Sequence, residues 1–484
     1  MTSFRVIPLI LFACLLSAVA GSREPLGPSS RRTGLVISEI MYHPPPRLDG
    51  RNTEFIELFN SEPTPANISG FLLAGDANFA FPTNTTIPPR SFLVVAPVPA
   101  DVQNAYGIAG VLGGFGDPTN SLPNDRGTIR LRSKAGAVLL EVTYSDDSPW
   151  PAAADGAGPS LVLARPSFGE RDPRGWEASR FVGGSPGAAE LTPNDPLDVV
   201  VINEFLAHTD DPDLDYVELY NHSNQSVDIS GCVLTDDPRT NKFVFPPSTL
   251  ILARGFVYIT QSNMNFSLSA DGEAIYLMNP NGTHVLDAIR FGPQENGVSS
   301  GRFPDGASEI YRLSSKTRAT SNAGIRVSDV VINELMYHPL SEDDNDQYVE
   351  LYNRSGNSVT LSGWRLTDAI RFTFPTTAVI APGGYVVVAE NAARLLTNYP
   401  NLTSNNTFGN FSGRLSASGE HLALTKPDTI VATNTMGGLE TNTIHITVDE
   451  LEYGTGGRWP KFADGGGSSL ERIDPRSDSR LASN

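Results

Sequence analysis

The sequence predicts an all-β chain divided into three tandem β-sandwich domains, and three observations support this prediction. A short motif, Val-Ile-Ser-Glu or Val-Ile-Asn-Glu, occurs at residues 36–39, 201–204 and 331–334. A second motif with a central glutamate follows each copy, and successive copies are more than about 130 residues apart, which is the size of a domain. The chain also holds 44 Gly and 37 Pro, which separate its short apolar runs.

Composition is typical of an exported, loop-rich protein and excludes nucleic-acid binding as the main role. The formal net charge is −19 at pH 7, and a polyanion repels a phosphate backbone. Of the two cysteines, Cys14 lies in the N-terminal apolar segment, so Cys232 has no intrachain disulfide partner. Stability must therefore come from packing.

Residues 1–20 are predicted to be a secretory signal peptide. Arg5 supplies a positive start, residues 6–16 are almost wholly apolar, and residues 18–20 match the small residues before a cleavage site. A lipoprotein signal with a lipid-anchored Cys14 is the alternative. No segment is long enough for a membrane-spanning helix, so we expect a secreted or cell-surface protein without a transmembrane segment.

The third copy contains seven apolar or aromatic runs bounded by polar turns, which predict seven strands. They are residues 330–336, 347–352, 363–367, 371–374, 384–389, 421–424 and 447–453. Turns rich in Pro, Gly and Asn at residues 134–137, 279–282 and 380–384 fit between such strands. Seven short strands in one unit are typical of an immunoglobulin-like β-sandwich with two antiparallel sheets.

The repeated residues also carry a family resemblance. The two glutamate motifs, then Leu-Ser-Gly-Trp-Arg-Leu-Thr-Asp at 361–368, Phe374-Pro375 and Ala-Pro-Gly-Gly at 381–384, resemble the lamin tail domain (LTD) family. The resemblance covers nearly all of the mature chain in three tandem copies. It implies an immunoglobulin-like fold and an adhesion or interaction role in secreted bacterial multidomain proteins. In such proteins the domain often stands beside a kinase-like domain of the spore-coat type or beside hydrolase domains. The family itself supplies no catalytic residues.

These patterns predict domains at residues 34–187, 198–324 and 328–484, joined by short linkers. Copy one lacks a counterpart of Trp364 from the motif at 361–368, and in copy two Cys232 takes the place of Trp364. The stretch that begins at Trp150 recurs at Trp459, but the counterpart of Trp176 would fall just past the last residue. We therefore expect the third domain to be truncated at its C-terminal end.

Paired glutamates are the first candidates for chemistry. The pairs are Glu39 with Glu57, Glu204 with Glu218, and Glu334 with Glu350. Two carboxylates perform acid–base catalysis in glycosidases, but an active site is rarely copied with every scaffold unit. We interpret the pairs as structural carboxylates, hydrogen-bonded within or at the edge of the first two strands of each domain.

Acid-rich loops between these strands are the second candidates. The potential calcium ligands are Asp210, Asp211, Asp213 and Asp215 in copy two and Asp343, Asp344 and Asp346 in copy three. Neither loop has the spacing of an EF-hand, and acidic hairpin tips are commonly solvated. The sequence therefore predicts no cofactor and leaves calcium as the alternative.

Other catalytic motifs are missing from the sequence. His43 and His338 precede prolines at strand ends, which is typical of hydrogen-bonded turn residues, and no His or Cys lies at zinc spacing. The sequence has no Gly-x-Ser-x-Gly elbow, and Cys232 has no evident His partner. We expect that the chain is not an enzyme.

The predicted function is binding without catalysis. The chain is expected to be an exported adhesion or interaction module that contacts a protein or a surface polymer through loops and edge strands. Two alternatives stay open. The chain is the N-terminal scaffold of a larger exported enzyme, kinase-like or hydrolase, or it is a structural spacer.

Overall fold

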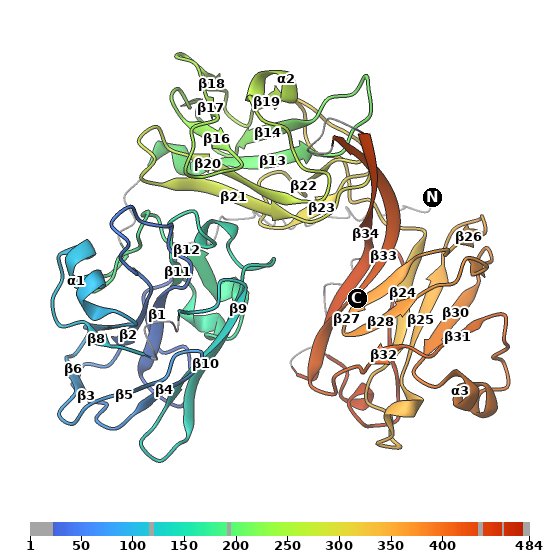
Figure 1. Ribbon diagram of the computed structural model, residues 1–484, viewed down its shortest axis with the longest axis horizontal. Coiled ribbons are helices and arrows are strands. Elements are labelled where there is room, and N and C mark those ends of the chain that lie inside the picture. Colours follow the sequence, from blue (N-terminus) through green and yellow to red (C-terminus); the bar gives the residue numbers. More distant parts are fainter. Residues whose placement is uncertain (1–22, 116–120, 191–194, 434–438, 457–458, 478–484) are drawn as a thin grey trace, which may run out of the picture.

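The computed structural model describes residues 23–115, 121–190, 195–433, 439–456 and 459–477, so the predicted signal peptide, residues 1–20, lies outside the described residues. Figure 1 shows three β-sandwiches that follow one another along the chain as an arch, with the second between the first and the third. The predicted all-β fold of three tandem immunoglobulin-like sandwiches is confirmed. Among the described residues, no helix has the length and apolar character needed to cross a membrane.

Domain 1 consists of two sheets. Its strands are β1 (Leu35–Met41), β2 (Phe55–Asn60), β3 (Ala66–Asn67), β4 (Leu72–Gly75), β5 (Phe79–Ala80), β6 (Thr86–Ile87), β7 (Phe92–Ala96), β8 (Leu112–Gly113), β9 (Arg126–Arg132), β10 (Val138–Ser145), β11 (Leu161–Leu163) and β12 (Trp176–Ala178). Its helices are α1 (Pro99–Tyr106), η1 (Ala152–Ala154), η2 (Pro166–Phe168) and η3 (Pro173–Gly175). The sheet orders are β12-β11-β1-β2-β7-β8 and β10-β9-β4-β5, with β3 paired to β6 beside them.

Domain 2 repeats this plan. Its strands are β13 (Val200–Leu206), β14 (Tyr216–Asn221), β15 (Val227–Asp228), β16 (Val233–Thr235), β17 (Phe243–Val244), β18 (Leu250–Ile251), β19 (Phe256–Thr260), β20 (Glu273–Met278), β21 (Val285–Phe291), β22 (Ser300–Arg302) and β23 (Ile310–Arg312). Its helices are η4 (Pro196–Val199) and α2 (Gln261–Met264). The sheet orders are β19-β14-β13-β22-β23 and β17-β16-β20-β21, with β15 paired to β18.

Domain 3 repeats it again. Its strands are β24 (Val330–Met336), β25 (Tyr348–Asn353), β26 (Val359–Thr360), β27 (Arg365–Asp368), β28 (Ile370–Thr373), β29 (Val379–Ile380), β30 (Tyr385–Ala389), β31 (Thr407–Gly409), β32 (Ser412–Gly413), β33 (Gly419–Thr433), β34 (Leu439–Gly454) and β35 (Leu470–Glu471). Its helices are η5 (Asp344–Asp346), α3 (Ala392–Asn398) and η6 (Lys461–Ala463). The sheet orders are β31-β30-β25-β24-β35 and β32-β28-β27-β33-β34, with β26 paired to β29.

Each domain buries its own hydrophobic core between its two sheets. The residues on either side of the second glutamate are buried in three separate clusters: Ile56 and Leu58, Val217 and Leu219, and Val349 and Leu351. Alternate residues of a strand point to opposite faces, so these positions face the second sheet of the same domain. The three segments are therefore independent sandwiches.

One hairpin is much longer than the sequence predicts. The expected strands at 421–424 and 447–453 are part of β33 and β34, which pair from Gly419 with Gly454 to Thr433 with Leu439, with one register shift between Leu424 and Thr425. Only Leu422 to Thr425 of β33 also pair with β27, so the rest of the hairpin extends past the sheet. Figure 1 shows that it reaches towards domain 2.

The first motif forms a β-bulge in every domain. The register between β1 and β2 shifts between Ile37 and Glu39, which makes Ser38 an extra residue. The register shifts at the same place in domains 2 and 3, where Asn203 and Asn333 are the extra residues. A bulge re-aims the side chains around it, and the small polar residue of the motif therefore points to a new partner.

The second motif ends on an asparagine that ties two loops together. The three asparagines are Asn60, Asn221 and Asn353, and all are fully buried. The amide nitrogen of Asn221 lies 2.7, 3.2 and 2.9 Å from the carbonyl oxygens of Gln225, Ile251 and Leu252. Its side-chain oxygen accepts the Ser223 N–H at 2.9 Å. Asn60 and Asn353 make the same four contacts, so the motif needs an amide side chain at this position.

Replacement of this asparagine is expected to destabilise the domain that contains it. Asn221→Ala leaves buried carbonyl groups without their donor, and we expect a loss of about 2–3 kcal/mol in the free energy of unfolding of domain 2. Hydrogen exchange of β13 and β14 in increasing urea measures this loss. The control, Asn224→Ala, changes an exposed residue of the same loop and should cost less than about 0.5 kcal/mol. Equal losses for the two variants would contradict the assignment.

Candidate functional site: paired glutamates on the first two strands

Every domain carries two glutamates that face each other across its first two strands. Glu39 lies opposite Glu57, and the same register joins Glu204 to Glu218 and Glu334 to Glu350. The second glutamate alternates with core residues, so the pair projects from the outer face of the first sheet. In domains 1 and 2, other parts of the chain cover this face, and these four glutamates are at most 2% exposed.

In domain 1, the bulge and the end of the domain supply hydrogen bonds to the carboxylates. The Ser38 hydroxyl donates to Glu57 at 2.7 Å. The backbone N–H groups of Ser185 and Gly187 donate to Glu39 and Glu57 at 2.8 and 2.6 Å. We call residues 179–190, which lie across the pair, the closing segment of domain 1.

Domain 2 has an equivalent closing segment at residues 315–323. The Thr317 N–H and hydroxyl donate to Glu204 at 3.1 and 2.9 Å, and the Tyr216 hydroxyl donates to it at 2.7 Å. The Ala319 N–H donates to Glu218 Oε2. The other oxygen of Glu218, Oε1, is buried and has no hydrogen-bond partner among the described residues.

The pair of domain 3 is more open. The Tyr348 hydroxyl donates to Glu334 at 2.6 Å, and the Asn333 amide donates to Glu350 at 3.0 Å. Both glutamates are only half-buried. In the part of the chain that the structure describes, no segment donates backbone N–H groups to them as the closing segments of domains 1 and 2 do.

Burial raises the pKa of Glu39, Glu57, Glu218 and Glu350. Loss of solvent raises the pKa of Glu218 to about 8, despite the opposing bond from the Ala319 N–H. Burial likewise raises the pKa of Glu39 and Glu57, and the charge of Glu39 adds to the effect on Glu57. Burial also raises the pKa of Glu350. A carboxyl whose pKa is raised in this way retains its proton towards neutral pH.

In domains 1 and 2, this arrangement is not suited to acid–base catalysis on a substrate. A pair of catalytic carboxylates needs room for a glycosidic bond between them and access for water. In domains 1 and 2, the backbone of the closing segment takes that space and donates to the carboxylate oxygens. The structural interpretation of the pairs agrees with these contacts, but no sequence signal indicated donors that come from the far end of the domain.

The two histidines that precede prolines are hydrogen-bonded turn residues, as predicted. His43 Nδ1 bonds to the Asp155 carboxylate just after η1, and the Gly156 N–H donates to the His43 carbonyl oxygen at 3.1 Å. Domain 3 repeats this turn, with His338 Nδ1 2.7 Å from Asp464 Oδ1. We refer to these as the histidine turns.

The acidic loop of domain 2 does not gather its four carboxylates at one point. Asp213 pairs with Lys316 at 2.5 Å. Asp215 is buried and accepts a threonine hydroxyl at 2.8 Å, whereas Asp210 accepts an asparagine amide at 2.5 Å. Asp211 is exposed. The loop therefore disperses the oxygens that calcium would need together.

The acidic loop of domain 3 is closed by an arginine. Arg394 of α3 binds Asp343 at 2.8 Å and Asp346 at 2.6 Å. Asp344 lies 3.7 Å from Arg414. The guanidinium group therefore pairs with two of the three candidate calcium ligands of this loop, Asp343 and Asp346. The sequence did not reveal these ion pairs, because Arg394 lies far from the loop along the chain.

The structure brings together one cluster that the sequence did not indicate. Asp195, Asp198 and His284 offer ligand atoms within 4.8 Å of one another at the junction of domains 1 and 2. Arg180 of the closing segment donates to both oxygens of Asp198, at 2.6 and 2.8 Å. A protein cation therefore already pairs with the cluster, which joins the end of domain 1 to the start of domain 2.

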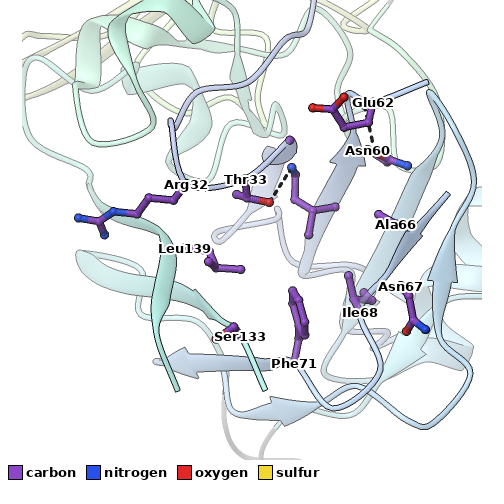
Figure 2. Close-up of a pocket in the computed structure, with 12 residues that line it drawn as sticks. Arg32, Thr33, Asn60, Glu62, Ala66, Asn67, Ile68, Phe71, Ser133 and Leu139 are labelled. Atoms are coloured by element: carbon purple, nitrogen blue, oxygen red, sulfur yellow. Dashed lines mark hydrogen bonds between the residues drawn. The ribbon is translucent and has the colours of Figure 1, made fainter. Parts of the chain in front are cut away.

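Domain 1 contains a hollow with a volume of about 310 Å³. Figure 2 shows the residues that line it. Ile68 and Phe71 give it an apolar wall. Its polar groups serve the fold, because the Asn60 amide contacts three backbone carbonyls and Arg32 donates to the Val138 carbonyl oxygen at 3.1 Å. These contacts leave the hollow without a set of groups arranged for chemistry.

Cys232 is part of the domain 2 core. It is 0% exposed, and its thiol is free. Burial raises the pKa of this thiol to about 12, so it stays protonated and shielded from oxidants. In domain 3, Trp364 packs against the core from the equivalent position.

The repeated bulge, glutamate pair and buried asparagine define a tandem array of one immunoglobulin-like β-sandwich module. The Lamin Tail Domain model matches residues 28–146, 194–292 and 325–446, and the chain belongs to the lamin tail domain family. These domains are of a non-catalytic type.

The chain was also compared with curated proteins and with solved structures. Among curated proteins, none matches the chain in sequence. A solved structure of a DUF4876 family protein from Bacteroides thetaiotaomicron is 14% identical, with 38% of this chain and 71% of that chain covered. The TM-score is 0.19.

Removal of one buried carboxyl is expected to change the pH dependence of stability. Because the pKa of Glu218 is about 8 in the fold against 4.5 ordinarily, folding takes up a proton between these values, and stability falls as the pH rises through them. Glu218→Gln keeps the shape and an acceptor for Ala319. The free energy of unfolding of Glu218→Gln, relative to that of the wild type, should therefore rise by about 3 kcal/mol from pH 5 to pH 8. Urea unfolding at the two pH values measures this difference.

The matched control for this variant is Asp271→Asn, which changes an exposed carboxyl of the same domain. It should leave the difference between pH 5 and pH 8 unchanged. A Glu218→Gln variant with the same pH slope as the wild type would show that the buried carboxyl is not held protonated.

Calcium is expected not to bind the acidic loop of domain 3 while Arg394 occupies it. Isothermal titration of the full chain with millimolar calcium should give no heat beyond dilution, because displacement of the guanidinium from Asp343 and Asp346 costs two ion pairs. The same titration of Arg394→Ala serves as the comparison. A saturable heat in the wild type would contradict this expectation.

Proposed function

We propose that this chain is an exported, non-catalytic interaction module that binds a protein or a surface polymer. The observation that carries the proposal is that the glutamate pair, which is repeated in all three domains, is bonded to residues of its own domain. In domains 1 and 2 the closing segments cover it completely. Membership of a family of non-catalytic sandwiches supports the same conclusion.

Contact with a partner is proposed to use loops and edge strands. In domain 2, Val244 of the edge strand β17 is 49% exposed, and Leu250 and Leu252 near β18 are 58% and 67% exposed. In domain 3, Val379 and Tyr385 are 47% and 48% exposed. Single apolar residues are common on surfaces, but those on edge strands and at sandwich ends can take part in strand addition or loop contacts.

The proposed site of action is outside the cytoplasm. The charged start, apolar stretch and small residues of 1–20 support export by a signal peptide. The state of the cysteine is compatible with an oxidising compartment, because Cys232 is buried and its thiol does not meet solvent. A lipid anchor on Cys14 is the alternative route to the cell surface.

A pull-down experiment tests the proposed function. The full chain is immobilised and exposed to bacterial cell-wall, polysaccharide and surface-protein fractions, with an unrelated β-sandwich of similar net charge as the control. We expect specific retention of one fraction, and retention should survive Glu350→Gln. No retention, together with a rigid arch in X-ray scattering, would contradict binding and favour a spacer. An activity lost in Glu350→Gln without a change in thermal stability would favour an enzyme.

A further inference from the structure

The junction between domains 1 and 2 joins two distinct surfaces. The first, which we call the head, consists of η1 and Asp155 beside the histidine turn of domain 1. The second, which we call the tail, is the outer face of the β17-β16-β20-β21 sheet of domain 2. Ala153 of the head is buried with Val233 and Tyr276 of the tail in one apolar cluster. Arg290 of the tail pairs with Asp155 of the head.

The junction between domains 2 and 3 also joins the end of one domain to the second sheet of the next, but its contacts are polar and lie on the extended β33–β34 hairpin. The head of domain 2 is the turn at His208 with the loop at Glu295 and Asn296, and the tail of domain 3 includes β33 and β34. Lys426 of β33 pairs with Glu295 at 2.7 Å, and Asp428 accepts the Asn296 N–H at 3.4 Å. Both junctions among the described residues therefore place the head of one domain on the tail of the next.

Domain 3 also has a head, and its apolar part is uncovered. η6 follows Trp459 as η1 follows Trp150, and both end beside a histidine turn. Phe462 of η6 holds the position of Ala153 in η1. Ala153 is 6% exposed because domain 2 covers it, whereas Phe462 is 73% exposed and the nearby Leu340 is 70% exposed. Phe462 is thus exposed to solvent at the position where, in domain 1, Ala153 contacts domain 2.

The charge of this head is also less compensated than that of domain 1. Asp155 contacts both His43 and Arg290, and its side chain is 10% exposed. Asp464 pairs with His338 among the described residues, no arginine reaches it there, and its side chain is 36% exposed. The bond to Asp464 raises the pKa of His338, whereas burial and Arg290 lower the pKa of His43. The head of domain 3 therefore lacks the cation that a tail provides.

Domain 1 has the complementary uncovered tail. Leu72 of β4 lies opposite Arg132 of β9, as Val233 lies opposite Met278 in domain 2. Leu72 is 38% exposed, whereas Val233 at the junction is 3% exposed. Arg130 and Arg132 project from the same face, because they alternate with buried residues of β9, and Arg130 already pairs with Glu141 of β10. Figure 1 shows no ribbon of domain 2 or 3 against β4 and β9.

We propose that the head of domain 3 docks onto the tail of domain 1 in a second copy of this chain. Phe462 packs against Leu72, and Asp464 pairs with Arg132, which lies opposite Leu72. Head and tail are different surfaces on different domains, so the contact is heterologous and copies join into open chains instead of a closed dimer. This contact is separate from the binding of a protein or surface polymer proposed above, and either one can fail without the other.

Sedimentation of the full chain over a range of concentrations tests the proposal. We expect the wild type to form a ladder of oligomers. Phe462→Asp and Leu72→Asp should each weaken association by at least about tenfold, because a carboxylate replaces an apolar contact at the centre of the interface. Both side chains are exposed, so thermal stability should not change. Phe168→Asp, which alters a 49% exposed phenylalanine outside both surfaces, should associate like the wild type.

A mixture of the two variants is the sharper test. Phe462→Asp keeps its tail and Leu72→Asp keeps its head, so an equimolar mixture should form dimers and nothing larger. A wild type that is monomeric at every concentration would overturn the proposal. So would a mixture that stays monomeric although the wild type associates, or an equal loss of association in Phe168→Asp.

Discussion

Carboxylates that leave water must be hydrogen-bonded or protonated, and this requirement organises each domain. The glutamate pair lies on the first two strands, but its donors at Gly187 and Ala319 come from the end of domains 1 and 2. The closing segment therefore has to return across the outer face of the first sheet. The same segment leads into the next domain, because Arg180 binds Asp198 at the start of domain 2. In domain 1, the same segment thus covers the glutamate pair and contacts the start of domain 2.

The arch depends on contacts of two kinds. An apolar cluster between η1 and the second sheet of domain 2 makes the first junction. Polar contacts to the long β33–β34 hairpin make the second, including a bond from Arg312 to the Val448 carbonyl oxygen at 2.7 Å. The exposed surfaces that remain are edges, loops and the ends of the array.

Local pattern and repetition were enough to predict the strands that carry the repeated motifs. The strand at 330–336 matches β24 residue for residue, and the interpretation of the paired glutamates agrees with their contacts. The extension of β33 and β34 was missed because Pro427, Asp428 and Asn442, residue types that are rare in strands, interrupt its β-branched residues. The closing segments were missed because backbone N–H donors have no side-chain signature. Arg394, which closes an acidic loop, was missed because that contact is long-range in the sequence.

Hydrogen exchange at the closing segments tests the structural role of the glutamate pairs most directly. We predict that the N–H groups of Ser185, Gly187 and Ala319, which donate to buried glutamates, exchange as slowly as those of the first two strands at neutral pH. Exchange at the rate of an unprotected loop would show that the pairs are open to solvent. The structural role assigned to the glutamates would then be wrong.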